Sequence, residues 1–358
     1  MFIHAPPRGI HMKYKYLGQT GMRVSTLCLG TGPYGVAPQE DEAIRLVHHA
    51  LDVGINFVDT ANSYGNQARI DRPGAPPAAE RPSSETIVGK ALRGRRDSVV
   101  LATKVREVVG TDVNDAGLSR RHIMQQVDRS LKALQTDYID IYHLHGPDKF
   151  TAIEETLRTM DDLVRIGKVR YFGLSNFSAW RLTYALGAAK LLGTELPVIH
   201  QIGYNLVSRK AEQDVIPACE HLGLSVSTYG SLNGGLLSGT DILQRKIVGL
   251  GRFVEDKSVK FQFPADEIAA AERLEAYAAE WGHPPAHIAL AWLMSRKVHA
   301  TAIIGPETSE ELDASAPAME LELSANQLAL LDALLPAPPA WEAMYDNALE
   351  QQTAQLGK

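Results

Sequence analysis

The sequence predicts an α/β fold of the (β/α)8 TIM-barrel type, with an N-terminal hairpin and extra helices in its C-terminal part. Apolar runs of strand length alternate with amphipathic stretches of helical spacing along most of the 358 residues. The ends of the eight apolar runs are mostly about 25 to 45 residues apart, the length of one strand–helix unit. A doubly wound sheet is the alternative, but no Gly-x-Gly-x-x-Gly follows the first strand, where a nucleotide fingerprint is expected.

Each element is expected from its own local pattern. Residues 13–25 contain two short runs around Gly18 and Gly21, which predict a hairpin. The eight barrel strands are expected at 26–30, 56–61, 99–104, 138–145, 169–176, 198–205, 225–231 and 301–305. Helices are expected near 40–53, 119–134, 151–166, 178–192, 212–221, 265–281, 285–296, 309–314 and 324–334.

The barrel is expected to form one domain over residues 13–335, between a flexible leader at 1–12 and a C-terminal tail at 336–358. Residues 66–83 interrupt the rhythm with four prolines and several charges. This insertion either folds over the mouth of the barrel and helps to select the substrate, or is a surface excursion. Its arginines, Arg69, Arg72 and Arg81, suit an anionic or sugar-like substrate, although exposed arginines usually serve solubility alone.

Composition excludes several classes of protein. The net charge is −6, without a dense basic cluster, which argues against a nucleic-acid surface. Two cysteines are too few for a disulfide framework, and no apolar run reaches the roughly 18 residues that span a bilayer. We therefore expect a cytoplasmic protein with no membrane or nucleic-acid partner and no metal site. The oligomeric state is left open.

Polar residues follow the ends of three successive strands, where barrel enzymes place their active sites. Asp59, Tyr64, Lys104 and His145 form a set suited to donating a proton. A phenol with a pKa near 10 is too weak an acid alone, and a nearby ammonium lowers that pKa. Tyr64 is thus the expected general acid, Lys104 its activator, Asp59 the partner of Lys104, and His145 the group that orients a carbonyl oxygen.

Each of these residues also has a plain structural interpretation. A Tyr before a Gly is often a packed loop residue, and a Lys that ends a strand is usually solvated. Period-two alternation puts His143 on the same side of its strand as His145, so either could be a core histidine. His145 lies nearer the mouth, which favours it as the functional residue.

Several ordered motifs resemble the aldo-keto reductase superfamily, in its bacterial branch similar to channel β subunits and aryl-alcohol dehydrogenases. They are Phe57-Val58-Asp59-Thr60-Ala61 with Tyr64-Gly65, Ala102-Thr103-Lys104, the 138–148 segment with His145, Phe172-Gly173-Leu174-Ser175-Asn176-Phe177, and Gln201 with Tyr204-Asn205. The resemblance covers about 13–335. It implies a TIM barrel, a nicotinamide cofactor, and Asp59, Tyr64, Lys104 and His145 as the catalytic four, with Asp59 also near the cofactor.

The resemblance also implies a cofactor site. Ser175, Asn176 and Gln201 are expected to hold the nicotinamide carboxamide, and Tyr229 to stack on the ring. The pyrophosphate is expected along Gly230, Ser231, Leu232 and the glycine-rich loop from Gly234 to Gly239, whose backbone N–H groups can bind phosphate oxygens.

The adenosine end departs from the family pattern. Gly305 resembles the entry to this site, with Thr308 as a hydroxyl contact, but Glu307, Glu311 and Ser315 stand where a basic or small residue, Gln and Asn are usual. A carboxylate repels a ribose 2′-phosphate, whereas it accepts hydrogen bonds from free ribose hydroxyls. Alternatively, these acids simply occupy the first turn of a helix. We expect NADP(H) ahead of NAD(H).

The sequence therefore predicts an NAD(P)H-dependent oxidoreductase that reduces an aldehyde or ketone to an alcohol, or runs the reverse reaction. Two other functions are open. A barrel lyase or aldolase would use Lys104 as a neutral Schiff-base amine, which pairing with Asp59 disfavours. A nicotinamide-binding regulatory subunit would show little turnover.

Overall fold

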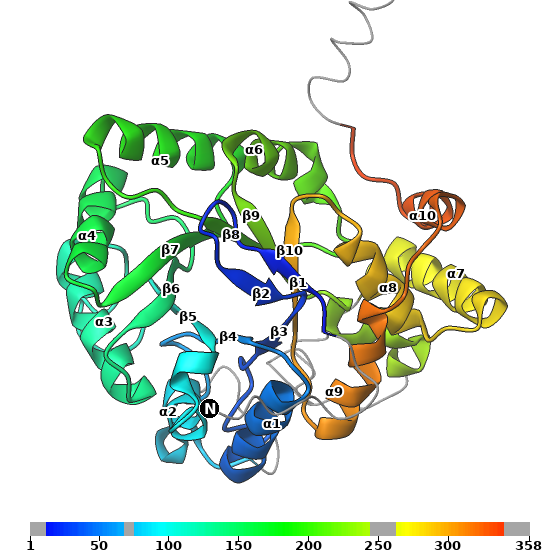
Figure 1. The fold of residues 1–358 in the computed structure, drawn as a ribbon, viewed down its shortest axis with the longest axis horizontal. Coiled ribbons are helices and arrows are strands. Elements are labelled where there is room, and N and C mark those ends of the chain that lie inside the picture. The colour runs from blue at the N-terminus through cyan, green and yellow to red at the C-terminus, as the bar shows by residue number, and fades with distance from the viewer. Residues whose placement is uncertain (1–11, 68–74, 244–262, 340–358) are drawn as a thin grey trace, which may run out of the picture.

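A closed barrel of eight parallel strands forms the centre of the computed structural model, which describes residues 12–67, 75–243 and 263–339 (Figure 1). Its strands are β3 (Leu27–Gly30), β4 (Phe57–Asp59), β5 (Val100–Val105), β6 (Ile139–Leu144), β7 (Val169–Ser175), β8 (Ile199–Gly203), β9 (Ser225–Tyr229) and β10 (His299–Ile304). Neighbouring strands follow chain order, and β10 pairs with both β9 and β3 to close the ring. The predicted fold class is confirmed, with strand ends displaced by a few residues from the expected ones.

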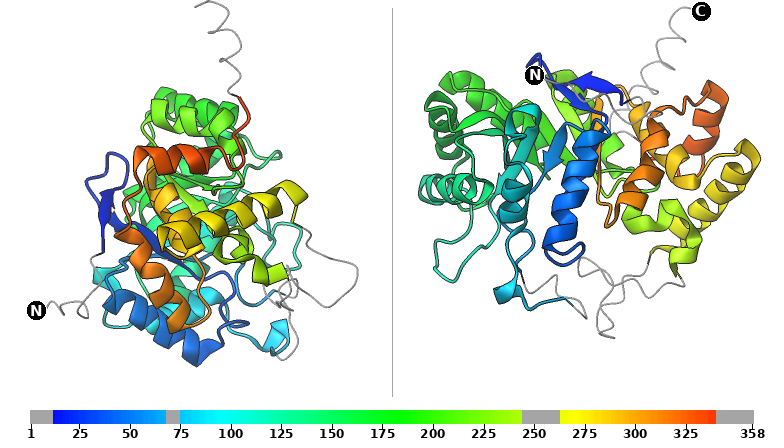
Figure 2. Two further views of the ribbon diagram at one scale, coloured as in Figure 1. Left: turned by 90° about the vertical axis from the view of Figure 1, so that its right-hand side faces the viewer. Right: turned by 60° about the horizontal axis from the view of Figure 1, so that its bottom comes forward.

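Helices surround this ring on its outer side (Figure 1). They are α1 (Glu40–Asp52), α2 (Ser84–Ala91), α3 (Arg120–Leu134), α4 (Ile153–Arg165), α5 (Ala179–Leu192) and α6 (Val215–Leu222), followed by α7 (Ala265–Trp281), α8 (Pro285–Met294), α9 (Ser309–Ser315) and α10 (Ala325–Asp332). The last four lie together on one side of the barrel, where α8 packs against β10 (Figures 1 and 2). No helix of the described parts of the chain is both long and apolar enough to cross a bilayer.

Two helices differ from the sequence prediction. The stretch predicted as one helix at 212–221 is a 3-10 turn, Lys210–Gln213, followed by α6. Helix α2 was not predicted at all, because it is short and contains Thr86, Val88 and Gly89, which favour helices weakly. Tertiary contacts stabilise it instead: Ser83 caps its first turn, and Gly89 packs directly on the backbone of α3.

The hairpin identifies which end of the barrel is closed. Strands β1 (Tyr14–Tyr16) and β2 (Arg23–Ser25) confirm the predicted hairpin. Leu17 and Val24 of this segment join an interior cluster with Phe57, Val100 and Ile199. These last three lie in the first half of their strands, so the hairpin covers the amino-terminal end of the barrel. The carboxyl ends of the strands, at the opposite side, remain for the site.

Parts of the predicted organisation fall outside the described residues. These are residues 1–11 of the expected leader, 68–74 of the 66–83 insertion, with Arg69 and Arg72, and 340–358 of the expected tail.

Candidate active site

Lys104 is a buried cation at the carboxyl end of β5. Its Nζ donates to Oδ2 of Asp59 at 2.5 Å and to the carbonyl of Thr60 at 2.7 Å. Burial lowers the pKa of Lys104, but the charges of Asp59 and Tyr64 outweigh it, so the pKa lies above the ordinary value. The structure therefore contains a charged ammonium paired with a carboxylate, as predicted from the order of the strands.

Tyr64 projects its ring over this pair. Nζ of Lys104 lies 4.8 Å from the centroid of the ring, and the phenol oxygen is 3.4 Å from Nε2 of His145. The rings of Tyr64 and His145 meet edge to face at 5.8 Å. Lys104 and His145 thus lie beside Tyr64, and Asp59 is connected to it through Lys104.

The backbone around Tyr64 is held from both sides. Its N–H donates to the carbonyl of Ala61 and its carbonyl accepts from the N–H of Ser84. Gly65 follows with φ +90°, and a Cβ at this position would lie 2.6 Å from the nitrogen of Ser84 and 2.8 Å from the carbonyl oxygen of Tyr34. Only glycine fits there, so the Tyr-Gly pair is a structural requirement for placing the phenol.

Helix α2 contributes two buried side chains that sequence reasoning missed. Oγ of Ser84 lies within hydrogen-bond distance of Oγ1 of Thr31 and Thr60, at 2.8 and 3.0 Å. Glu85 accepts from Oγ1 of Thr103 at 2.6 Å. Burial raises the pKa of Glu85, against hydrogen bonds from Thr103 and Ser130 and the charge of Lys104, which lower it. The signal was Ser83-Ser84-Glu85 before an apolar run, a typical helix start.

The ends of β7 and β8 bring Ser175, Asn176 and Gln201 to the same site. Nε2 of Gln201 donates to Oδ1 of Asp59 at 2.8 Å, so Asp59 has a partner on each oxygen. Asn176 adopts a left-handed backbone with φ 61°, and its Nδ2 donates to the carbonyl of His145 at 3.0 Å and to Oγ of Ser175 at 3.1 Å. The predicted carboxamide-binding residues are therefore linked to two of the predicted catalytic residues, Asp59 and His145.

Tyr229, at the end of β9, lies next to these residues. Its hydroxyl donates to Oδ1 of Asn176 at 2.9 Å. Its ring covers Gly203, where a Cβ would lie 3.2 Å from the ring atoms, and the residue is 39% exposed. The Tyr229 side chain is thus partly exposed beside Asn176.

The loop after β9 presents backbone more than side chains. Ser231 is buried, and its Oγ lies 3.0 Å from the carbonyl of Ile303 and 3.1 Å from that of Thr228. A 3-10 segment, Asn233–Ser238, follows Gly230 and Leu232, and Gly234 and Gly239 within and after it have φ of 64° and 157°. The hydroxyl of Ser231 is therefore hydrogen-bonded to the backbone of the barrel wall.

At the end of β10, the acidic residues take part in capping α9. Oγ1 of Thr308 accepts from the N–H of Glu311 at 3.2 Å, and the Glu311 carboxylate accepts from the N–H of Glu307 at 2.8 Å. Oγ of Ser315 donates to the carbonyl of Glu311 at 2.9 Å. The space around Gly305 is open. The helix-start explanation of the acids has a structural basis here.

Residues 26–336 match the model of the aldo/keto reductase family. The chain belongs to the aldo/keto reductase family. It is 37% identical over 338 residues to "Uncharacterized oxidoreductase YrpG" of Bacillus subtilis (strain 168), covering 91% of this chain and 97% of that protein.

Two further relatives show how varied the family is. A "Probable voltage-gated potassium channel subunit beta" of Oryza sativa subsp. japonica is 32% identical over 318 residues, covering 87% of this chain and 92% of that protein. "Versiconal hemiacetal acetate reductase" of Aspergillus parasiticus is 29% identical over 353 residues, covering 90% of this chain and 96% of that protein. Family membership supports oxidoreductase activity with a nicotinamide cofactor on small carbonyl compounds.

In this aldo/keto reductase, the two candidate histidines of β6 are clearly separated. His143 is buried inside the barrel against Gly173, where a Cβ would lie 2.6 Å from its Nδ1. Burial, with the charge of Lys104, lowers the pKa of His143 to about 3, so it is neutral. His145, one residue beyond the strand, is the one that reaches Tyr64.

The prediction that Arg81 is exposed is wrong. Arg81 is 5% exposed. Its guanidinium donates to the carbonyls of Gly65 at 2.9 Å, Pro76 at 2.7 Å and Gln67 at 3.1 Å. Three carbonyl partners within one loop make a planar guanidinium a structural centre. Arg81 therefore fixes the described part of the 66–83 insertion behind Gly65.

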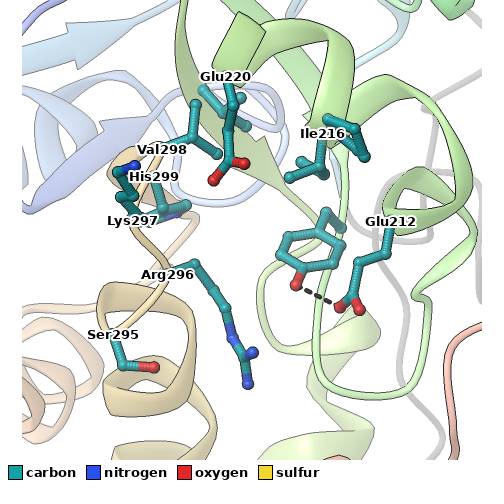
Figure 3. Close-up of a pocket in the computed structure, with 11 residues that line it drawn as sticks. Glu212, Ile216, Glu220, Ser295, Arg296, Lys297, Val298 and His299 are labelled. Atoms are coloured by element: carbon teal, nitrogen blue, oxygen red, sulfur yellow. Dashed lines mark hydrogen bonds between the residues drawn. The ribbon is translucent and has the colours of Figure 1, made fainter. Parts of the chain in front are cut away.

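A cavity of about 350 Å³ lies elsewhere, between α6 and the segment that joins α8 to β10 (Figure 3). Ile216, Glu220, Arg296 and Val298 line it, together with Tyr204, whose hydroxyl donates to Glu212. None of the predicted site residues lines it. It lies near the amino-terminal ends of β9 and β10, away from Tyr64. Among the described residues, no three His, Cys, Asp or Glu side chains are grouped as metal ligands.

Proposed function

We propose that this chain, through a catalytic unit at residues 13–335, reduces an aldehyde or ketone with NAD(P)H, or oxidises the corresponding alcohol, with Tyr64 as general acid and base. The observation that carries the proposal is the position of the Lys104 ammonium, which is bonded to Asp59 and lies 4.8 Å from the ring of Tyr64. A neighbouring cation favours the ionised form of a phenol and so makes it a better proton donor. The oxygen of a carbonyl group needs that proton as its carbon is reduced.

Asp59 keeps Lys104 charged and in place. Its two oxygens accept from Lys104 and Gln201, so the carboxylate has little freedom to turn away. The raised pKa of Lys104 also argues against a Schiff-base lyase or aldolase, which needs a neutral amine at this position. Lys104 acts on Tyr64 and forms no bond with the substrate.

His145 orients the substrate. Its Nε2 and the phenol oxygen of Tyr64 are 3.4 Å apart, which allows one carbonyl oxygen to accept from both groups. The carbonyl of His145 accepts from Asn176, which restricts the loop that bears the ring. The substrate carbonyl is thereby directed toward the phenol.

The residues beside this centre fit a nicotinamide dinucleotide. Ser175, Asn176 and Gln201 offer hydroxyl and amide groups for the carboxamide, and the partly exposed Tyr229 offers an aromatic ring on which the nicotinamide would stack. Gly230, Ser231, Leu232 and the segment from Gly234 to Gly239 offer backbone N–H groups for the pyrophosphate. When bound, a reduced nicotinamide supplies the hydride for the carbonyl carbon.

NADP(H) is proposed ahead of NAD(H). The carboxylate of Glu311 accepts a backbone N–H of Glu307, and Thr308 caps the same helix. This capping accounts for the acid at 311 without a bond to ribose, which removes one argument for NAD(H). Glu307 is the residue on which the preference depends, because it stands where a basic or small residue is usual.

Fluorescence titration with NADPH and with NADH tests the proposal, on the wild type and on Glu307→Arg. We expect the wild type to bind NADPH more tightly and the variant to bind it more tightly still. A wild type that prefers NADH, reversed by Glu307→Arg, would place this carboxylate at the ribose. Binding without turnover of any of a panel of aldehydes would favour a regulatory subunit. Binding of neither cofactor would overturn the proposal.

A further inference from the structure

His200 is a buried histidine on the outer side of the barrel wall, directly before Gln201 in β8. Because side chains alternate along a strand, Gln201 points into the barrel and His200 points to the helix layer. Its Nε2 accepts from the backbone N–H of Phe177 at 3.1 Å. Its Nδ1 lies 3.8 Å from Sγ of Cys219 on α6.

The tautomer of His200 follows from these contacts. A backbone N–H can only donate, so Nε2 must be the unprotonated nitrogen of a neutral ring and Nδ1 carries the proton. That proton is directed at the sulfur of Cys219. Burial lowers the pKa of His200 to about 3, and burial, with the charge of Glu220, raises the pKa of the Cys219 thiol to about 12. Both groups are neutral over the physiological range, and the acceptor at Nε2 is permanent.

The bond from Phe177 closes a turn with an unusual backbone conformation. Asn176, the preceding residue, has φ 61°, a left-handed conformation that is disfavoured for residues other than glycine and is least unfavourable for Asn and Asp. Its own N–H donates to the carbonyl of Gln201 at 3.0 Å. Two consecutive residues of β8 therefore accept the two consecutive N–H groups of this turn, Gln201 through its backbone carbonyl and His200 through its side chain on the outer face of the barrel.

This turn directs the amide of Asn176. Nδ2 of Asn176 donates to the carbonyl of His145, and Oδ1 accepts from the hydroxyl of Tyr229. If the turn relaxed to an ordinary backbone conformation, the side chain would leave both partners. Phe177 would also leave its buried position, where it is 4% exposed.

We propose that His200 is a positioning residue of the cofactor site: as a fixed neutral acceptor behind the barrel wall, it keeps the Asn176–Phe177 turn in the form that presents Ser175 and Asn176 to the nicotinamide carboxamide. That His200 holds the turn follows from the geometry of the turn, whereas its effect on cofactor binding rests on the proposed function. His200 touches neither substrate nor cofactor.

Three variants separate positioning from general stability. His200→Leu fills the space but removes the acceptor, whereas His200→Gln retains one in its side-chain oxygen. Leu46→Ala deletes a buried side chain on α1, across the barrel from α5 (Figure 1), and is the matched control for a destabilised barrel. Thermal unfolding of all three variants measures how much each one loses in stability, so that effects on the turn can be compared at a known loss.

The first measurement is the amide exchange rate of Phe177 in the protein without cofactor, followed by mass spectrometry or NMR. His200→Leu is expected to raise this rate about tenfold or more relative to the amides of β6, because a buried N–H loses its partner. His200→Gln is expected to restore it to within about threefold of the wild type. Leu46→Ala is expected to leave the ratio of Phe177 to β6 unchanged. An unchanged ratio in His200→Leu would overturn the proposal.

The second measurement is the dissociation constant for NADPH by fluorescence. His200→Leu is expected to weaken binding about tenfold, with His200→Gln close to the wild type, and Leu46→Ala unaltered. Weakening that His200→Gln does not rescue, or equal weakening in Leu46→Ala, would contradict a positioning role. If the wild type bound no nicotinamide cofactor, the proposed function would fail, and the exchange ratio would still decide whether His200 holds the turn.

Discussion

The arc of the barrel from β4 to β8 and the arc formed by β9 and β10 are built in different ways. In the first, side chains at successive strand ends bond to one another: Lys104 to Asp59, Asp59 to Gln201, and Asn176 to the backbone of His145. In the second arc, the side chains that are expected to contact the cofactor form hydrogen bonds with nearby loop and helix backbone instead. Ser231 contacts the wall, and Thr308 and Glu311 cap α9.

This difference indicates two ways of making a site. Chemistry at one atom requires side chains fixed in pairs, since a misplaced proton donor loses most of its effect. A long ligand with phosphates and sugars can be bound by loop backbone and open space. We therefore expect substitutions in the β4–β8 arc to change catalysis strongly, and those in the β9–β10 arc to change affinity modestly.

Matched Tyr→Phe substitutions give the sharpest form of this comparison. Tyr64→Phe removes the proposed proton donor and should lower kcat by a factor of about 10² to 10⁴. The affinity for NADPH should stay within about twofold, because Tyr64 is proposed to touch the substrate. Tyr229→Phe removes the bond to Asn176 and should change the affinity for NADPH a few-fold. Steady-state kinetics and fluorescence titration measure both; similar losses of kcat in the two variants would erase the distinction.

Lys104→Met should destabilise the fold as well as the chemistry. It leaves the buried carboxylate of Asp59 without its cation, at a cost of about 3 to 5 kcal/mol. The pKa of Lys104 is raised in the folded state, so its contribution is complete below the unfolded value of about 10.4 and is lost as the pH rises through the folded pKa. Urea unfolding of both proteins should show a constant difference from pH 7 to 10 that shrinks above this range. A difference that grows with pH would show that the sign is wrong.

Glu85 tests whether α2 supports the site by hydrogen bonding or by charge. Its pKa is raised by burial, so the folded state binds its proton more tightly, and stability falls as the pH rises from about 4.3 through the folded pKa. Glu85→Gln keeps an acceptor for Thr103 and should remove this pH dependence, with stability at pH 7 equal to or above that of the wild type. Glu85→Leu orphans the Thr103 hydroxyl and should cost about 1 to 3 kcal/mol. Equal stability of the two variants would exclude the hydrogen bond as the important interaction.

Thr308→Ala should have the smallest effect. It removes the cap of α9 and should cost about 1 kcal/mol of stability, measured by thermal unfolding. The affinity for NADPH should fall by less than about threefold, because the Thr308 hydroxyl already accepts the N–H of Glu311. A tenfold loss of affinity at unchanged stability would instead make the Thr308 hydroxyl a direct ligand.

Much of the fold and of the candidate catalytic group could be predicted from sequence. The apolar runs place each strand end to within a few residues, and a parallel barrel brings those ends together, so Asp59, Lys104 and His145 were expected as neighbours. Helix α2 was missed because its stability comes from tertiary contacts of Ser84 and Glu85. The burial of Arg81 was missed because three carbonyl groups of its own loop surround it, and no sequence pattern encodes such a loop conformation. His200 was missed because its role depends on a turn in another loop.

The central claim is that the charge of Lys104 acts on the phenol of Tyr64. An ultraviolet difference titration tests it without a substrate: the Tyr64→Phe spectrum is subtracted from that of the wild type, and the same subtraction is made in a Lys104→Met background, with Lys104→Arg as the variant that keeps the charge. We predict that Tyr64 ionises at a pH at least about one unit lower when residue 104 is charged than when it is Met. The same midpoint in all three backgrounds would contradict the account.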